Sequence, residues 1–296
     1  PPLLAQCLLN RGLTEPAAIT GFLQPRLKQL ADPFLLPNMG AAVERLLQAR
    51  HRNEPLVIFG DYDVDGVTST ALLLEVLRPL GWNVQYYLPH RMDEGYGLSQ
   101  DGVENCLAKF PATLLLAVDC GSTAVASIAS LRQRGVDVIV LDHHQVCSPA
   151  PAATALVNPQ LGVPSPPPFT ELCSAGLAFK LAHALLKRGR ETSLPGAAEF
   201  DLRPLLDLVA LATVADIVLS TLSVDYHETI MAPAGKAAEK SLLDSITANK
   251  GKYLCVVEGS IPLKDDGVYC TIGGKTALAL ARQVCGGAAA TIAMGS

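Results

Sequence analysis

LVIFGDYDVDG, residues 56–66, predicts a buried β-strand followed by a turn that is rich in carboxylates. The carboxylates of this turn belong to Asp61, Asp63 and Asp65. At the carboxyl end of a strand, where the backbone turns into a helix, such side chains can converge on one cation. A second apolar strand ends in Asp142, His143 and His144. Because hard oxygen ligands together with imidazole suit Mn²⁺ or Mg²⁺, the two strand ends predict a site for one such ion or for a pair.

The stretch from Pro55 to Leu141 alternates between short apolar strands and helices. Strands are predicted at residues 56–59, 84–88, 113–118 and 136–141. Helices are predicted at residues 67–80, 99–109 and 123–134. This alternation predicts an α/β fold with a mostly parallel sheet and helices on both faces. Ligands bind beyond the carboxyl ends of the strands in such sheets, and Asp119 joins the Asp61 and Asp142 runs at these ends.

The remainder of the chain divides at proline-rich and irregular stretches. Residues 1–48 predict a helical lead-in with breaks at Pro16, Pro25, Pro33 and Pro37. A single domain is expected over residues 49–219. It includes a Pro-rich connection at 149–168, which we expect on the surface, and apolar helices at 174–187 and 203–215. The second of these helices leads to Asp216. A partial flavodoxin-like α/β segment is expected over residues 220–296, with strands at 222–226, 253–257 and 289–294 and helices at 235–249 and 275–284. Because the sequence stops directly after a strand, we expect this last domain to be truncated.

Composition limits the classes of protein to which the chain can belong. Its 296 residues, 49% of them hydrophobic, suffice for two domains with apolar cores. No apolar run is long enough to cross a bilayer and no signal-peptide pattern is present, so we expect a soluble protein of the cytoplasm. The eight cysteines include no C-x-x-C pair, which excludes a zinc knuckle and a dithiol redox motif. A net charge of -5 argues against a broad basic surface for nucleic acid but is compatible with a cleft neutralised by metal ions.

Two other motifs explain parts of the sequence less well. The run at residues 61–66 also opens an EF-hand calcium loop, but that loop follows a helix and needs glutamate at its twelfth position, where Leu72 stands. A solvated acidic turn is the remaining alternative for this run, and the polar residues at the next strand ends favour the metal site instead. Residues 273–276, GGKT, do not form a P-loop, because that motif requires glycine at position 269, where Tyr269 stands.

Six motifs follow one another along the chain: FGDYDVDGVTSTA (59–71), PHRMDEGYGL (89–98), VDCG (118–121), LDHH (141–144), LVNP (156–159) and LDLVALATVADIV (206–218). Together they resemble the motifs of the DHH phosphoesterases, and most closely those of the RecJ branch, which are single-strand-specific 5′ to 3′ exonucleases. The resemblance spans residues 1–219, because the lead-in with DPFLLP at 32–37 is also similar to that branch.

This resemblance implies a two-metal site that prefers Mn²⁺ and hydrolyses single-stranded DNA to 5′ mononucleotides. The implied metal ligands are Asp63, Asp65, Asp119, His143 and Asp216, with Asp119 bridging both ions. His144 is implied as a charged donor to the scissile phosphate, with Asp142 orienting the imidazoles and Asp61 as a further, weaker candidate for such support. Arg91 is the candidate for holding a phosphate, with an exposed salt bridge as the alternative. Phe59 departs from the pattern, since several relatives have histidine there, and we expect weaker binding of the first ion.

A second resemblance covers residues 216–296. LSTLSVDYHETIMAPAG (219–235), VVEGSIP (256–262) and DGVYCTIGGK (266–275) are similar to the small subunit of nickel-iron hydrogenases. That subunit binds iron-sulfur clusters through an early C-x-x-C, which is absent here, and through a Gly-Ser-Cys, of which the sequence holds only Gly295 and Ser296. We therefore expect no iron-sulfur cluster, and a hydrogenase large subunit as partner only if this segment were complete. The two resemblances indicate a chimera, either a misassembled reading frame or a natural fusion.

Several functions follow as alternatives. The first is a metal-dependent phosphodiesterase acting on single-stranded DNA in repair and recombination. The second is a DHH phosphatase of short oligonucleotides or cyclic dinucleotides, and the third is a fragment of a hydrogenase electron-transfer subunit. We also expect that the phosphodiesterase is slow or inactive, because the second lobe that closes over the strand in such enzymes is missing from this sequence.

Overall fold

The computed structural model describes residues 2–161, 169–218, 243–244, 246–248, 250–251, 254–258, 271–272, 275–288 and 290–294. The chain forms two compact units, residues 1–221 and residues 222–296, and each is described by itself. The strand predicted at 222–226 lies outside the described residues. Of the helix predicted at 235–249, residues 243–244 and 246–248 are described, and they are helical. Within the described part of the chain, no helix combines the length and the apolar character needed to cross a membrane.

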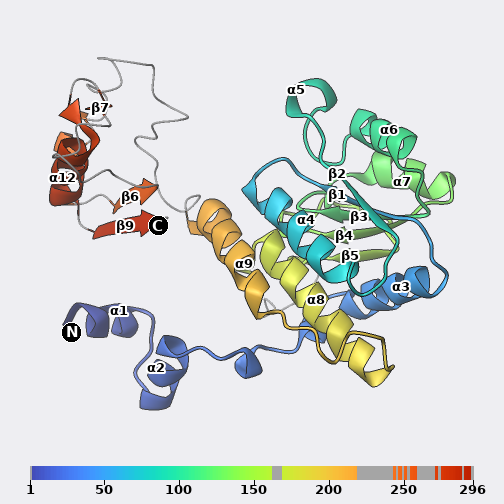
Figure 1. The fold of residues 1–296 in the computed structure, drawn as a ribbon, viewed down its shortest axis with the longest axis horizontal. Coiled ribbons are helices and arrows are strands. Elements are labelled where there is room, and N and C mark those ends of the chain that lie inside the picture. Colours follow the sequence, from blue (N-terminus) through green and yellow to red (C-terminus); the bar gives the residue numbers. More distant parts are fainter. Residues whose placement is uncertain are drawn as a thin grey trace. The chain divides into compact units, whose positions relative to one another are not determined.

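A five-stranded parallel sheet forms the centre of the first unit, in the order β2-β1-β3-β4-β5 (Figure 1). Its strands are β1 (Leu56–Gly60), β2 (Val84–Tyr87), β3 (Leu114–Val118), β4 (Asp137–Leu141) and β5 (Ala155–Val157). The register aligns Gly60 with Val118, Val118 with Leu141 and Leu141 with Val157. Four strands therefore end in one row, and the residues that follow this row meet at one edge of the sheet.

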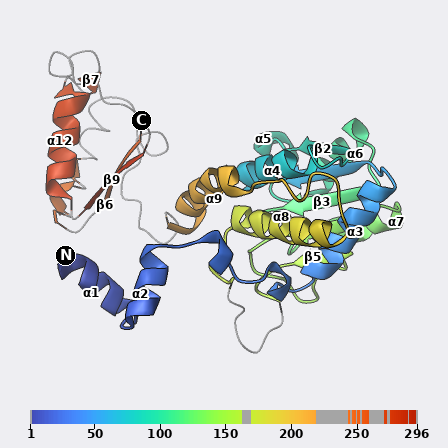
Figure 2. The ribbon, with the colours of Figure 1, turned by 60° about the horizontal axis from the view of Figure 1, so that its bottom comes forward.

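Two helical layers cover the sheet, as predicted, because alternate strand residues point to opposite faces. Ile58 and Leu116 pack with α3 (Met39–His51), α4 (Val64–Leu77) and α8 (Ser174–Glu191) on one face. Val57 and Leu115 pack with α6 (Gln100–Lys109) and α7 (Val125–Gln133) on the other. Figures 1 and 2 show α8 beside α4 on the first of these faces. The predicted α/β class is confirmed, and its buried strands explain the nearly continuous apolar runs in the sequence.

The lead-in contains short helices, as its prolines predict. They are α1 (Pro2–Asn10), α2 (Pro16–Leu23), η1 (Leu27–Gln29) and η2 (Pro33–Leu35). Pro16 and Pro33 open their helices, where a missing N–H costs nothing. The remaining helices of this unit are α5 (Arg91–Glu94), η3 (Arg203–Leu205), α9 (Leu206–Ala212) and η4 (Thr213–Val218), a π-helix that continues α9.

The start of α4 and the position of the Pro-rich connection differ from the sequence-based expectations. Helix α4 begins at Val64 instead of residue 67, because the Asp63 side chain accepts a hydrogen bond from the N–H of Gly66 at 2.9 Å and caps the first turn. The connection 149–168 is not wholly on the surface, since it contains β5, whose three residues are buried. The strand was not predicted because it lies in a proline-rich stretch and has only three residues, which are too few to show a periodic pattern.

The second unit contains a parallel pair of strands, β6 (Leu254–Glu258) and β9 (Ala290–Met294). Helix α12 (Ala277–Gly287) lies between them in the sequence. A short antiparallel pair, β7 (Thr271–Ile272) and β8 (Lys275–Thr276), precedes the helix. The two longer strands and the helix fall within three residues of the predicted ranges, whereas the short pair was not predicted.

Candidate metal centre

The aligned strand ends bring four polar residues into one row. Asp61, Asp119, Asp142 and Asn158 each follow directly after the register row that joins β1, β3, β4 and β5. All four side chains are buried. Because carboxylates are rarely buried without compensation, this row is the chemically unusual part of the domain.

The turn after β1 supplies two further carboxylates, those of Asp63 and Asp65. Asp63 is the exposed N-cap of α4, and Asp65 lies buried in the first turn of that helix. Both oxygens of Asp65 accept backbone hydrogen bonds from the start of α8, from the N–H of Ser174 at 2.6 Å and from that of Ala175 at 2.8 Å. Asp65 therefore caps α8 across the domain and fixes the start of that helix over the strand ends.

Asp119 lies at the centre of the site. Its φ of 62° is in the left-handed region, which is uncommon for a residue other than glycine and costs backbone energy. The residue is 2% exposed, and neither carboxylate oxygen has a hydrogen-bond partner among the described residues. Such a group is expensive in the folded chain unless a cation or a proton compensates it.

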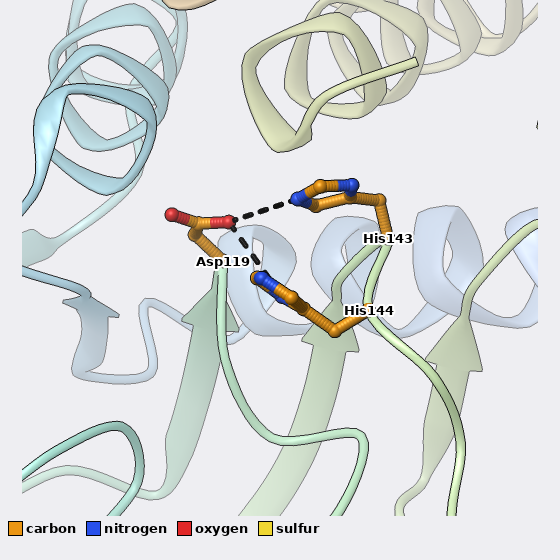
Figure 3. Close-up of side chains that lie close together, drawn as sticks. All are labelled: Asp119, His143 and His144. Carbon is orange, nitrogen blue, oxygen red and sulfur yellow. Dashed lines mark ion pairs between the residues drawn. The ribbon is translucent and has the colours of Figure 1, made fainter. Parts of the chain in front are cut away.

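Two adjacent imidazoles approach Asp119 from the end of β4 (Figure 3). The Nε2 atom of His143 lies 3.6 Å from Oδ1 of Asp119, 3.3 Å from Oδ2 of Asp216 and 3.8 Å from Oδ2 of Asp65. This nitrogen is buried and has no hydrogen-bond partner within the described part of the chain. The Nδ1 atom of His144 lies 4.0 Å from the same oxygen of Asp119. None of these contacts is a hydrogen bond, and atoms at these separations could be neighbouring ligands of one ion.

Within the described residues, three overlapping sets of side chains could each hold a metal ion, with ligand atoms no more than 4.8 Å apart. The sets are Asp61, Asp63 and Asp119; Asp65, His143 and Asp216; and Asp119, His143 and His144. Asp119 and His143 each belong to two sets. The unpartnered oxygens of Asp119 and the unpartnered nitrogen of His143 thus face the space that an ion would fill, and the donor set suits a Mn²⁺-type ion.

The electrostatics of the cluster point in the same direction. Burial raises the pKa of Asp119 well above its ordinary value, and the charges of Asp65 and Asp63 raise it further. Burial also raises the pKa of Asp65, although the N–H groups of α8 oppose this shift. A divalent cation relieves both effects, because it replaces repulsion among carboxylates by attraction.

Asp142 plays a different part, because its carboxylate is fully hydrogen-bonded. Its Oδ2 accepts the N–H of Ser122 at 3.0 Å, and its Oδ1 lies 2.7 Å from Nδ1 of His144. Although burial opposes ionisation, hydrogen bonds from His144 and Ser122 lower the pKa of Asp142 to about 2. The same hydrogen bond raises the pKa of His144. Asp142 therefore holds the His144 imidazole in place and favours its charged form.

Asn158 is a residue of the site that sequence reasoning did not single out, although it lies in the LVNP motif. Its side chain is 0% exposed. The amide nitrogen donates to Oγ of Ser122 and to the carbonyl of His144, both at 2.8 Å, and Oδ1 accepts the N–H of Gln160 at 2.7 Å. Asn158 thereby ties together the loops that follow β3, β4 and β5. The signal that could have identified it was its place one residue beyond a strand end.

Replacing Asn158 by leucine tests this tie. The substitution keeps the volume but leaves three hydrogen-bond partners unsatisfied, of which Ser122 is buried, so we expect a loss of about 2–4 kcal/mol in the free energy of unfolding, measured with urea. Asn38→Gly is the matched control, since its amide donates a single 2.8 Å hydrogen bond to the Leu156 carbonyl and its φ of 59° suits glycine. A loss no larger than that of the control, about 1 kcal/mol, would show that Asn158 does not hold the loops.

Gly66 offers a steric test of the turn between β1 and α4. A Cβ atom at this position would lie 2.5 Å from the carbonyl oxygen of Asp61 and 2.7 Å from its nitrogen, so the backbone must move. We expect Gly66→Ala to cost about 1–3 kcal/mol in unfolding free energy and to weaken Mn²⁺ binding in calorimetric titrations. Gly40→Ala is the control, because the added methyl group meets nothing within 4 Å in helix α3 and alanine favours the helix. Unchanged Mn²⁺ affinity in Gly66→Ala would contradict the proposed convergence of this turn on the ion.

The structure brings most of the predicted site residues together. Those gathered around Asp119 are Asp61, Asp63, Asp65, Asp142, His143, His144 and Asp216. The backbone of Arg91 opens α5, but its side chain lies outside the described residues, and its predicted role stays a prediction. Phe59 does not contribute to the cluster, because its ring is fully buried and stacks on Tyr87 at a centroid distance of 5.7 Å.

Comparisons with known proteins agree with this geometry. The model of the DHH family, N-terminal domain, matches residues 55–213. The single-stranded-DNA-specific exonuclease RecJ of Bacillus subtilis is 38% identical over 218 residues, which are 73% of this chain and 26% of that protein. The solved structure of RecJ in complex with Mn²⁺ from Thermus thermophilus is similar with a TM-score of 0.53 and 31% identity, over 71% of this chain and 27% of that one.

A different protein is similar to a smaller part of the chain. The hydrogenase-2 small chain of Escherichia coli is 44% identical over 84 residues, which are 28% of this chain and 23% of that protein. Both resemblances predicted from the sequence are thereby confirmed. The chain spans between 26% and 38% of the length of the first RecJ proteins that it matches.

Proposed function

This chain belongs to the DHH family, and on that basis we propose that its acidic cluster binds two divalent ions, Mn²⁺ in preference to Mg²⁺, and hydrolyses phosphodiester bonds in single-stranded DNA. The observation that carries the proposal is the centre of the cluster. There, both oxygens of Asp119 and the Nε2 atom of His143 are buried, unpartnered among the described residues and shared between sets of potential ligands. The manganese complex of a similar RecJ supports the choice of ion.

The ligands in this proposal are Asp63, Asp65, Asp119, His143 and Asp216, with Asp61 beside them. Two ions held by these residues would supply an activated water molecule and would neutralise the charge that develops on the phosphoryl oxygens. Asp119, which belongs to two of the sets, would be a ligand of both ions. The capping of α8 by Asp65 keeps that carboxylate in a single orientation. The preorganised carboxylates thus place the reacting phosphate without further rearrangement.

The imidazole of His144 is the proton-bearing group in this proposal. It is half-exposed, and its Nδ1 lies 2.7 Å from Asp142, so Nε2 is the ring nitrogen that we propose donates toward a phosphate oxygen. The raised pKa of His144 favours the charged form, which is the better donor to an anion. Arg91, at the start of α5, is proposed to grip a neighbouring phosphate through its planar guanidinium.

The substrate and direction are inferred from the RecJ similarity. We expect 5′ to 3′ removal of nucleotides from single strands, with release of 5′ mononucleotides. The similarity covers about a quarter of the Bacillus subtilis RecJ, so the activity of the present chain is the point to be tested. The proposal does not extend to residues 222–296, which form a separate unit.

A nuclease assay on the purified full chain tests the proposal. Single-stranded DNA with a 5′-phosphate is incubated with Mn²⁺, with Mg²⁺ or with a chelator, and duplex DNA and cyclic dinucleotides serve as competing substrates. We expect Mn²⁺-dependent release of mononucleotides from the single strand, slow in absolute rate, and loss of this activity in Asp63→Ala. Asp101→Ala, at an exposed position in the first turn of α6, is the control and should retain activity. Activity in the presence of chelator, or equal activity in Asp63→Ala, would refute the proposal, whereas a preference for cyclic dinucleotides would indicate the phosphatase alternative.

A further inference from the structure

We propose that Tyr96 and Tyr62 form a subsite on which the base of the 5′-terminal nucleotide stacks. The inference rests on the proposed nuclease function and deepens it, because it assigns recognition of the nucleobase to residues that the metal chemistry does not use. The chemical class of the ligand is a planar, uncharged nucleobase of any type.

The two tyrosines lie beside the metal centre. Tyr62 stands between Asp61 and Asp63 in the turn that follows β1. Its ring meets that of Tyr96 edge to face, with centroids 6.1 Å apart and an interplanar angle of 75°. Partial desolvation of the hydroxyl, together with the nearby charges of Asp61, Asp119 and Asp63, raises the pKa of Tyr96 to about 12. The pair therefore borders the carboxylates that would hold the ions.

The ring of Tyr96 is available to a ligand. The residue is 66% exposed, although a large aromatic side chain is normally buried. Exposure of an aromatic ring next to a site for a phosphodiester is the arrangement found in proteins that bind single strands by stacking, with every base offering a π-face. Because the two rings meet nearly at right angles, Tyr62 can cover at most one face of the Tyr96 ring.

The segment that carries Tyr96 is held firmly in place. The carboxylate of Glu94, which is 8% exposed, accepts hydrogen bonds from the hydroxyl of Tyr87, from the amide of Asn105 at 2.5 Å and from the N–H of His90 at 2.8 Å. The hydroxyl of Ser99 donates to the Glu94 carbonyl at 2.6 Å. Strand β2 and helix α6 thus fix this segment before any ligand arrives. Preorganisation of this kind reduces the entropy lost when a base binds.

Charge explains why stacking is needed at this site. The chain has a net charge of -5, and the metal centre itself is built from carboxylates. A chain with this net charge attracts the DNA backbone less than a basic chain does, and bound ions would neutralise only the reacting phosphate. An aromatic subsite adds affinity that does not depend on charge, and it holds the terminal nucleotide in position for hydrolysis.

The experiment pairs two variants with two substrates on the full chain. Tyr96→Ala removes the ring, and Tyr96→Phe keeps the ring but removes the hydroxyl. The substrates are 5′-phosphorylated single strands that have either a normal or an abasic terminal nucleotide. We expect Tyr96→Ala to lower kcat/KM on the normal strand by about 5- to 150-fold and on the abasic strand by less than about twofold, with Tyr96→Phe close to wild type. Tyr86→Ala is the control and should behave as wild type, because Tyr86 is also exposed but lies on β2.

Binding measured without turnover separates this inference from the proposed function. A strand with 2-aminopurine at its 5′ end is titrated with protein in Ca²⁺, and stacking is detected as quenching of its fluorescence. Quenching by wild type and Tyr96→Phe but not by Tyr96→Ala supports the subsite even if hydrolysis is not observed. Equal loss of kcat/KM on both strands in Tyr96→Ala, an equal loss in Tyr96→Phe, or no quenching by wild type would overturn it.

Discussion

Replacing Asp119 by asparagine is expected to reduce Mn²⁺-dependent hydrolysis by about 1,000-fold or more, because the residue belongs to two of the three ligand sets. The substitution keeps the shape of the side chain. The rate of mononucleotide release under single-turnover conditions measures the effect. Asp137→Asn is the control, since Asp137 opens β4 at the opposite end of the strand and pairs with Arg45 at 2.7 Å. If Asp137→Asn loses as much activity as Asp119→Asn, the loss has to be assigned to a disturbed fold and not to the metal site.

The same variant should be more stable than the wild type when no metal is present. The pKa of Asp119 is raised in the folded chain, so the folded state holds a proton that the unfolded state releases near its ordinary pKa of about 3.9. Stability is therefore lost as the pH rises from that value toward the folded pKa. Asparagine removes this loss, and we expect about 1–3 kcal/mol of added stability at pH 8 and little difference at pH 4.

Thermal unfolding with chelator measures this difference in stability. Mn²⁺ should then raise the Tm of the wild type but not that of the variant. An equal rise in Tm in both proteins would contradict binding at Asp119.

Replacing Asp142 by asparagine is expected to reduce kcat by about 100- to 1,000-fold while leaving KM nearly unchanged. The carboxylate is the hydrogen-bond partner of His144 and raises its pKa, so the wild-type imidazole stays charged to a higher pH than usual. In the variant, the charged form is lost as the pH rises through the ordinary value of about 6.5. The descending limb of the rate against pH should therefore move to lower pH, which a profile of kcat from pH 5 to 9 will show.

A double substitution decides whether Asp142 acts through His144. If it does, the double variant should be no more impaired than His144→Gln alone, because Asp142 has no further effect once His144 is removed. Multiplicative losses would show that the two residues act independently. Similar Tm values for the single and double variants would confirm that the comparison concerns catalysis.

Much of the site could be predicted because it depends on a local rule. Residues just beyond apolar strands meet at one edge of a parallel sheet, and this rule found Asp61, Asp119 and Asp142 without knowledge of the register. The parallel order of the strands then follows from the alternation of strands and helices. Asn158 was missed for a local reason as well, since its strand has only three residues.

Other features depend on contacts between distant parts of the chain, to which sequence patterns are insensitive. The capping of α8 by Asp65 joins residues more than 100 positions apart in the chain. The π-helix at 213–218 that presents Asp216 to His143 was predicted only as the end of an ordinary helix. The early start of α4, in contrast, has a local cause, the capping of its first turn by Asp63, which was not predicted because this carboxylate was interpreted only as a metal ligand.

Asp65 is both a proposed metal ligand and the cap of α8, and this has a practical consequence for preparing a complex of the chain with DNA. Such a complex requires an inactive variant, and each ligand carboxylate is a candidate for substitution. Removal of Asp65, however, would also release the start of the 18-residue helix α8, which covers one face of the sheet. Asp63 is exposed and supports only the first turn of its own helix. An inactive trap should therefore be made at Asp63, and inactivity caused by changes at Asp65 should be attributed to chemistry only after the helix is shown to be intact.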